Sequence, residues 1–287
     1  GGLLPLPHWR LPRRRKGGGL MFRSIQAECF KVVHRPYFWI TTILCALFSV
    51  GVIFCLYLIK TEAGGVNPVN MPFAVASLLF GLPAGIYLVV LGVDMVFSEQ
   101  YKYNTLKNEV SFGVGRFRIY ASRWVVSLLV LAALYLVLVL VYALASLILL
   151  GLPSQADAQA MYGVDAGRSV LNAFRALGFY TLGAFPLWLG GMSLSLACYF
   201  LIASSNVAAF SYIGILMVLS MALDNLGQYV NPLFTSLYHL TLNYHMAQLL
   251  VGDLPWSKIG QCWLIGLGWT AVSTALGAAL FARKEIK

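Results

Sequence analysis

Charged side chains are scarce in this chain. Only 10% of its 287 residues are Asp, Glu, Lys or Arg, whereas 60% are hydrophobic, and the mean hydropathy is +0.78. A soluble domain carries about 25% charged residues, so this chain lacks the polar surface that a water-soluble fold needs. The composition therefore predicts a membrane protein.

The sequence also lacks the residue patterns of a catalytic or nucleotide-binding protein. Residues 17–19 are glycines followed by Leu-Met-Phe, so no Gly-rich loop ends in Lys-Ser or Lys-Thr as phosphate binding requires. The ten acidic residues are scattered, and no Ser/His/Asp or two-carboxylate arrangement falls within one expected layer. We expect no catalytic residues in this chain.

Metal-ligand and disulfide patterns are missing as well. The five cysteines, at positions 29, 45, 55, 198 and 262, show no Cys-x-x-Cys or Cys/His spacing and are interpreted as small apolar fillers. His239 and His245 are six residues apart, which places them on different faces of a helix. We expect no metal and no cofactor in this chain.

What the sequence does contain is six apolar stretches long enough to cross a bilayer. A helix of roughly 20 apolar residues spans the ~30 Å hydrocarbon core. The stretches cover residues 37–59, 73–97, 124–150, 176–202, 207–223 and 262–281, and only the fifth is short. They leave no room for a second globular domain, so we expect one all-α polytopic membrane domain over residues 37–287.

The basic residues fall mainly on one side of such a bundle. If the N-terminus is inside, only Lys60, Arg168, Arg175 and Lys258 lie on the outer side, and the other 16 of the 20 Lys and Arg residues are cytoplasmic. This is the positive-inside pattern. It predicts both termini in the cytoplasm, and it argues against a nucleic-acid partner despite the net charge of +10.

The first 36 residues divide into two parts. Residues 1–20 are rich in Gly, Pro and Arg, and we expect a disordered basic leader, either upstream of a natural start at Met21 or lying on the inner leaflet. Residues 21–36 have the pattern of an amphipathic helix that ends before Pro36 and suits the cytoplasmic interface; the alternative is an extension of the first span. The apolar face of this interfacial helix holds Phe22, Ile25, Cys29, Phe30 and Val33.

A polar and aromatic segment, residues 98–118, separates the second and third stretches. Its candidate partner-binding residues are Glu99, Tyr101, Tyr103, Asn104, Thr105, Lys107 and Asn108. Exposed aromatic and basic side chains are typical of protein interfaces. The alternative is an inner-leaflet loop that is anchored by tyrosines and by snorkelling arginines. The residues alone leave both interpretations open.

Asp94 is the one carboxylate well inside an apolar stretch, near the cytoplasmic end of the second. Intramembrane carboxylates are candidates for function. We expect an ion pair with Arg116, Arg118 or Arg123, which would anchor the 98–118 segment, in preference to a proton-relay role.

The outer segment 224–261 is more apolar than a water-exposed loop. It is predicted to form short helices that re-enter the outer leaflet, or else a pair of helices lying on the outer surface. Its main apolar residues are Leu233, Phe234, Leu237, Met246 and Leu249.

Small residues and prolines interrupt the second and fourth stretches. The residues concerned are Gly81, Pro83 and Gly85 in the second, and Gly183, Pro186, Gly190 and Gly191 in the fourth. Small residues permit close approach of helices and Pro frees a backbone carbonyl. Packing is the interpretation we favour, and kinks along a substrate route are the alternative.

The region around residues 99–123 resembles ABC-2-type ABC transporter permeases of the lantibiotic-immunity and bacitracin-export kind. The matching elements are Glu99, Thr105-Leu106-Lys107-Asn108, Gly113, Gly115, Arg116 and Ile119-Tyr120-Ala121-Ser122-Arg123, although the family commonly has Gly where Asn104 stands. The layout of residues 21–287 is also similar, with an amphipathic helix, six spans and a long outer segment before the sixth.

The resemblance implies the permease subunit of an ATP-driven exporter in a bacterial cytoplasmic membrane. It implies that 98–118 binds a separate ABC ATPase, which carries ATP and Mg, and that a second permease half, identical or paralogous, completes the path. The substrate would be amphipathic, such as an antimicrobial peptide, a lipid or a hydrophobic drug, and re-entrant helices in 224–261 would form an outer gate. The alternatives are a non-transporting immunity or scaffold protein and a secondary transporter.

Overall fold

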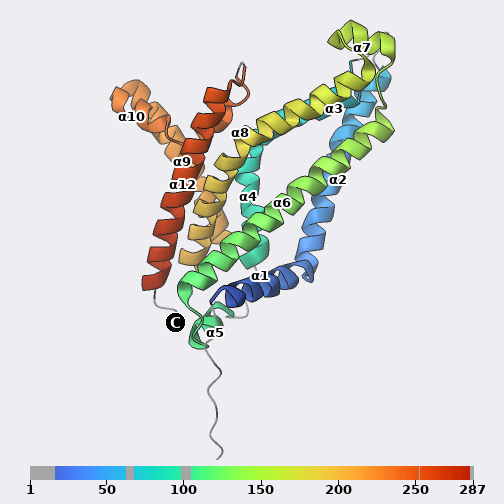
Figure 1. Ribbon diagram of the computed structural model, residues 1–287. Helices are drawn as coiled ribbons and strands as arrows, with labels where there is room; N and C mark the ends of the chain where they lie inside the picture. Colours follow the sequence, from blue (N-terminus) through green and yellow to red (C-terminus); the bar gives the residue numbers. More distant parts are fainter. Residues whose placement is uncertain (1–16, 63–67, 98–104, 252, 285–287) are drawn as a thin grey trace, which may run out of the picture.

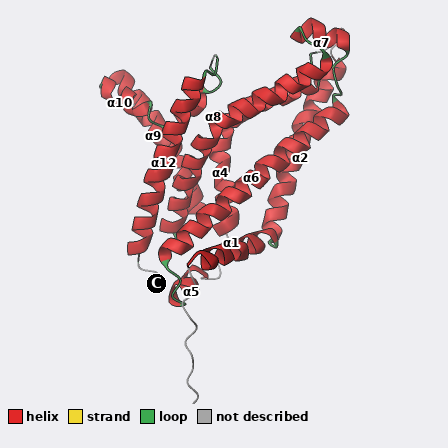
Figure 2. Ribbon diagram, viewed as in Figure 1, coloured by secondary structure: helices red, strands yellow, loops and turns green. Residues whose placement is uncertain are grey.

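The computed structural model describes residues 17–62, 68–97, 105–251 and 253–284, with the side chains of 17–20 left out. The described chain is helical, with no strand among these residues (Figure 2). The elements are α1 (Gly17–Val33), α2 (Pro36–Glu62), α3 (Met71–Ser77), the 3-10 helix η1 (Leu78–Gly81), α4 (Leu82–Phe97), α5 (Thr105–Ser111), α6 (Arg116–Leu149), α7 (Gln155–Tyr162), α8 (Ala166–Leu201), α9 (Ser205–Tyr229), α10 (Pro232–Tyr238), α11 (Leu242–Gln248) and α12 (Trp256–Arg283).

Six of the helical segments are long and apolar enough to cross a membrane, which confirms the predicted polytopic α-helical fold. They are Pro36–Glu62, Met71–Phe97, Arg116–Leu149, Ala166–Leu201, Ser205–Tyr229 and Trp256–Arg283. The third begins at Arg116 and not at residue 124, because Ile119, Tyr120 and Arg123 are buried and hold this partly polar turn against the protein. With 34 residues, α6 is about 50 Å long.

The central helix is α8, and α12 packs along it at backbone contact. A Cβ at Gly266 of α12 would lie 2.3 Å from the carbonyl carbon of Pro186, and one at Gly277 would lie 2.8 Å from the Ala197 Cβ. A Cβ at Gly190 would come within 3.1 Å of the Gly266 carbonyl oxygen. Pro186 and Gly190 therefore lie in a close helix contact of the kind that small residues permit.

The second span is not one continuous α-helix. It consists of α3, η1 and α4, and both Gly81 and Pro83 lie where the 3-10 turn passes into α4. Gly85 lies one turn further on, where a Cβ would be 2.6 Å from the Trp188 indole nitrogen. Of the three residues singled out in the second apolar stretch, Gly81 and Pro83 thus lie at a break between helices. Gly85 lies at a contact between helices.

Helix α1 lies across one end of the bundle (Figure 1). It begins at Gly17, earlier than the predicted Met21, and ends at Val33, so that Pro36 is the first residue of α2. Phe22 and Phe30 are more than 60% exposed, whereas Ile25 and Cys29 pack against the protein core. One part of the apolar side of α1 therefore packs against the rest of the protein, and the other part remains exposed.

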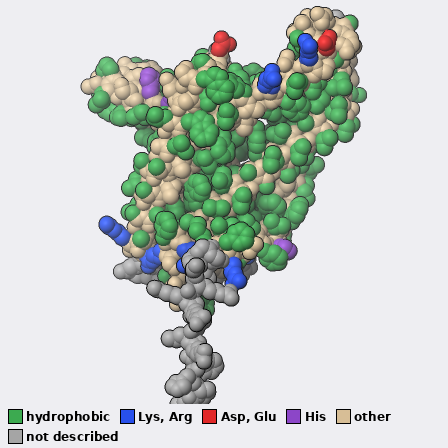
Figure 3. Space-filling model, in the orientation of Figure 1, with side chains coloured by type: hydrophobic (Ala, Val, Ile, Leu, Met, Phe, Trp, Pro, Cys, Tyr) green, Lys and Arg blue, Asp and Glu red, His purple; other side chains and the backbone are tan. Residues whose placement is uncertain are grey.

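The two ends of the molecule differ in what they present. Helices α1 and α5 and the end of α12 lie at one end, and α7 and α10 lie at the other (Figure 1). Hydrophobic side chains cover the middle of the visible face, and Lys and Arg gather at the ends (Figure 3).

We predict that the α5 end faces the cytoplasm and the α7 end faces outward, because most basic residues precede or surround α1, α5 and the end of α12. In a chain whose five cysteines are replaced, Gln159→Cys on α7 should react with an impermeant maleimide in sealed cells. Lys107→Cys on α5, which is also exposed, should react only after the membrane is opened. The opposite result would reverse the topology.

Candidate functional site

The short helix α5 presents a small surface at the α1 end of the molecule. It has seven residues and ends at Ser111, and the chain turns at Gly113, whose φ of +79° is a left-handed conformation that favours glycine. Leu106 is buried and attaches α5 to the core, while Lys107 and Asn108 are exposed and Thr105 is half-buried. The other predicted partner-binding residues, Glu99, Tyr101, Tyr103 and Asn104, lie outside the described residues.

One exposed aromatic at this surface was missed from the sequence. Phe112 directly follows α5 and is 86% exposed, among the most exposed large hydrophobic side chains of the described chain. The sequence signal was its position before Gly113, where the chain turns away from α5 and leaves the ring uncovered. An exposed ring beside Lys107 and Asn108 has the composition of a protein-binding patch.

Behind this surface, a network of charges connects α1, α5 and α6; Glu28 and Arg123 are buried, Glu109 is half-buried and Lys31 is exposed. The Arg123 side chain is 2% exposed, and its Nη2 donates to both carboxylate oxygens of Glu109, at 3.0 Å each. Its Nη1 lies 3.2 Å from Oε2 of Glu28 on α1. Lys31 Nζ donates to Oε1 of Glu28 at 2.7 Å and lies 3.7 Å from Glu109. Arg123 was predicted to anchor this segment, but the roles of Glu28 and Glu109 were missed.

The network is balanced in charge, with two carboxylates and two cations. Burial is the largest influence on Glu28 and would raise the pKa of its carboxyl, but Arg123 and Lys31 together outweigh it and lower that pKa. Glu28 is therefore ionised at neutral pH. Through its ion pairs with Arg123 and Lys31, Glu109 attaches α5 to the first turns of α6 and to α1.

Arg116 connects the same region to the end of the chain. Its Nη1 donates to the carbonyl oxygens of Phe281 at 2.9 Å, Ala282 at 2.7 Å and Lys284 at 2.7 Å. These carbonyls at the end of α12 carry the partial negative charge of a helix C-terminus. Arg116 therefore attaches the start of α6 to α12. Arg118 has no side-chain partner within the part of the chain that the structure describes.

The predicted ion pair between Asp94 and an arginine is wrong. Asp94 instead accepts hydrogen bonds from Tyr37 at 2.8 Å, from Tyr199 at 2.9 Å and from Ser205. The candidate arginines are engaged elsewhere, Arg116 by the end of α12 and Arg123 by Glu28 and Glu109. Asp94 therefore joins α4 to α2, α8 and α9 through hydroxyl groups.

At the opposite end, the outer segment forms α10 and α11, and its apolar residues divide into two groups. Met246 on α11 and Leu249, which directly follows α11, are at most 2% exposed and belong to the main core. Leu233 and Leu237 on α10 are exposed, and Phe234 is half-buried. Helix α11 is attached to α9 by Asn243, whose Nδ2 donates to the Leu216 carbonyl at 2.8 Å.

These features define a class of protein: a multi-pass helical membrane protein with a small polar surface at one end that is linked by buried charges to its spanning helices. Residues 24–165 match the family model described as ABC-2 family transporter protein. The match runs from α1 through the first three spans and includes α5. Together with the six spans, it supports the membrane permease subunit of an ABC-2 transporter. No curated protein matches the chain.

Proposed function

We propose that this chain is the permease subunit of an ATP-driven exporter, powered by a separate ABC ATPase that binds at α5. The observation that carries the proposal is the connection of the α5 surface to α1 and α6 through Arg123. A surface used only for attachment would not need it. A link from that surface into a spanning helix is what transmission of a conformational change requires.

In this proposal the ATPase partner holds ATP and Mg, and this chain supplies the path through a bacterial cytoplasmic membrane, with both termini inside. A second permease half, identical or paralogous, faces the first. The substrate is amphipathic, such as an antimicrobial peptide, a lipid or a hydrophobic drug, as in the lantibiotic-immunity and bacitracin-export permeases that the sequence resembles. The apolar segment 224–261 contributes an outer gate.

We predict that Phe112→Ala weakens binding of the ATPase about 30-fold, because loss of an interface aromatic typically costs about 2 kcal/mol. The measurement is co-purification of an ATPase subunit from cells that express both chains, together with the ATP hydrolysis that the permease stimulates. Phe48→Ala is the matched control, since Phe48 is 74% exposed but lies in the span α2.

Tyr101→Ala combined with Tyr103→Ala, in the segment outside the described residues, should act in the same direction as Phe112→Ala. Wild-type ATPase association and stimulation in all these variants would remove α5 and its neighbours as the docking surface. Association without any stimulated hydrolysis or export in the wild-type chain would instead favour a scaffold protein.

A further inference from the structure

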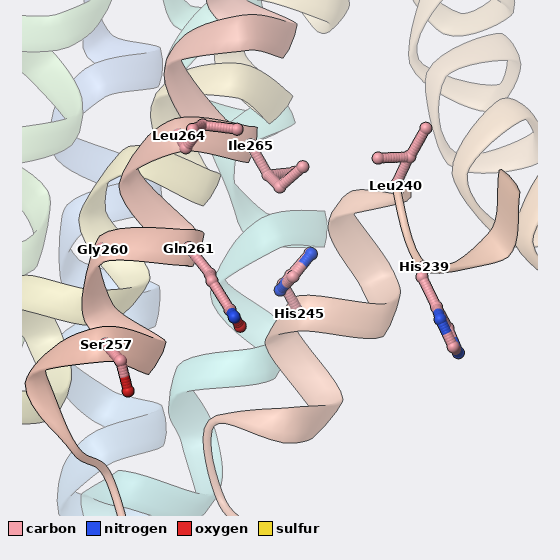
Figure 4. A pocket seen from close by; sticks show the side chains of 8 residues that line it. All are labelled: His239, Leu240, His245, Ser257, Gly260, Gln261, Leu264 and Ile265. Carbon is pink, nitrogen blue, oxygen red and sulfur yellow. The ribbon is translucent and has the colours of Figure 1, made fainter. Parts of the chain in front are cut away.

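A groove of about 360 Å³ lies between α11 and α12, at the α10 end of the molecule. Its polar lining includes His245, Ser257 and Gln261, and its apolar lining is Leu240, Leu264 and Ile265. The side chains of Gln261 and His245 point into the space between the two helices (Figure 4). The groove thus combines hydrogen-bonding groups with an apolar wall.

The groove is held in shape by the packing around it. The Trp269 indole on α12 donates to the Leu240 carbonyl at 2.8 Å, which fixes the turn between α10 and α11 against α12. Gly260 lines the groove and leaves room, since a Cβ placed there would meet no atom within 4 Å. The groove therefore lies between two helices that a hydrogen bond to the turn before α11 holds together, and no side chain at position 260 fills it.

His245 determines which hydrogen bonds the groove offers. The side chain is mostly buried, and this burial lowers the pKa of the imidazole. The ring is therefore neutral at neutral pH, with one N–H and one acceptor nitrogen. The unprotonated nitrogen of a neutral imidazole can accept a hydrogen bond from a ligand, which an imidazolium cannot do.

The remaining lining complements that acceptor. The Gln261 amide and the Ser257 hydroxyl supply donors, and neither has a partner among the described residues. Among the residues that the structure describes, no Asp, Glu, Lys or Arg lines the groove, and the Nζ of the neighbouring Lys258 donates to the Val251 carbonyl at 2.8 Å. A charged ligand group would lose its hydration without a counter-charge, and an ester would have no proton to give to His245.

We propose that this groove binds the secondary amide group of an amphipathic molecule. The amide N–H donates to His245, the amide carbonyl accepts from the Gln261 amide, and the apolar chain lies along Leu240, Leu264 and Ile265. A peptide main chain and an N-acyl lipid share this chemistry. The inference deepens the proposed function, on which it rests for the view that the ligand is a substrate near its exit.

The test uses three photoactivatable probes on the full chain in phosphatidylcholine nanodiscs, without an ATPase. They are N-methyldodecanamide, its N,N-dimethyl analogue and methyl dodecanoate, each with a diazirine on the acyl chain. The N-methyl amide should label residues 239–265 about three- to tenfold more strongly than the two probes without an N–H, the effect of one neutral hydrogen bond. An excess of a capped hydrophobic tripeptide or of a ceramide should displace it, and the effective competitor identifies the source.

Gln261→Leu should reduce labelling by the N-methyl amide about three- to tenfold, and this exposed position should tolerate the change. Gln228→Leu, at an exposed glutamine on α9 outside the groove, is the matched control and should label as the wild type. Equal labelling by the three probes, labelling unaffected by Gln261→Leu, or displacement by neither competitor would overturn the proposal. The labelling experiment contains no ATPase, so its outcome does not depend on ATPase docking. If co-purification showed no ATPase docking while labelling remained intact, the result would count only against the proposed function.

Discussion

Arg123→Leu is expected to destabilise the protein by about 3–5 kcal/mol, because removing one partner of a buried ion pair leaves uncompensated buried charge. Glu28 would keep only Lys31, and Glu109 would lose both hydrogen bonds to the guanidinium. The expected result is a lower unfolding temperature in detergent. Any folded fraction should bind the ATPase but transmit little of its motion, so that export falls more than ATPase association.

Arg118→Leu is the matched control for this prediction, since Arg118 lies on the same helix and has no side-chain partner in the described part of the chain. It should change the unfolding temperature little. A double-mutant cycle with Glu28→Gln and Arg123→Gln separates the pairwise term from general damage to the fold. If the two substitutions were additive, or if Arg123→Leu unfolded like the wild type, the network would not connect α1 to α6.

Leu249→Lys is the second substitution for which a large effect is expected. Leu249 is 0% exposed, and its Cδ2 lies 2.9 Å from the position of a Cβ on Gly183 of α8. A lysine there would need to enter the core or displace α11, at a cost of at least about 3 kcal/mol if the charge stays buried. The measurement is the amount of folded protein in the membrane and its unfolding temperature.

Leu237→Lys provides the contrast, because Leu237 is 42% exposed. Within one chain the new side chain can reach solvent, so folding and ATPase docking should remain intact. If a second permease half covers α10 as part of a gate, export should nevertheless fall. Normal export from Leu237→Lys would exclude a buried gate at α10, and normal folding of Leu249→Lys would contradict the packing of α11.

The positions of the spans could be predicted from the sequence because each apolar stretch is nearly continuous and a bilayer requires a helix of fixed length. The sequence did not determine where a span is interrupted, since packing was favoured over kinks for Pro83 and Pro186 alike. In the structure Pro83 follows the 3-10 turn η1, whereas Pro186 lies within the continuous helix α8. The ends of the spans were less predictable. Residues 116–123 are partly polar, and they belong to α6 only because Ile119, Tyr120 and Arg123 find buried partners.

The candidate site was predictable as a segment but not in its connections. The polar residues around position 107 left a partner-binding surface and an inner-leaflet anchor both open, and the family resemblance favoured the first. Phe112 became prominent only once the turn at Gly113 had left it uncovered. The sequence likewise could not select the partners of Asp94, because a carboxylate also accepts hydrogen bonds from hydroxyl groups, here those of tyrosine and serine on α2, α8 and α9.

By itself, then, the sequence determined the helical membrane fold, since composition and length along one chain are sufficient to specify spans. Only the tertiary structure decided which charges meet. Glu28 and Arg123 are far apart in sequence, and they lie 3.2 Å apart because α1 folds back across the start of α6. The tertiary structure also decided that Leu249 is buried while Leu237 is exposed. The reason is that α11 packs against α4 and α8, whereas α10 packs mainly against α9. Local pattern specifies a helix and its apolar face, but which neighbour covers that face is a property of the assembled bundle.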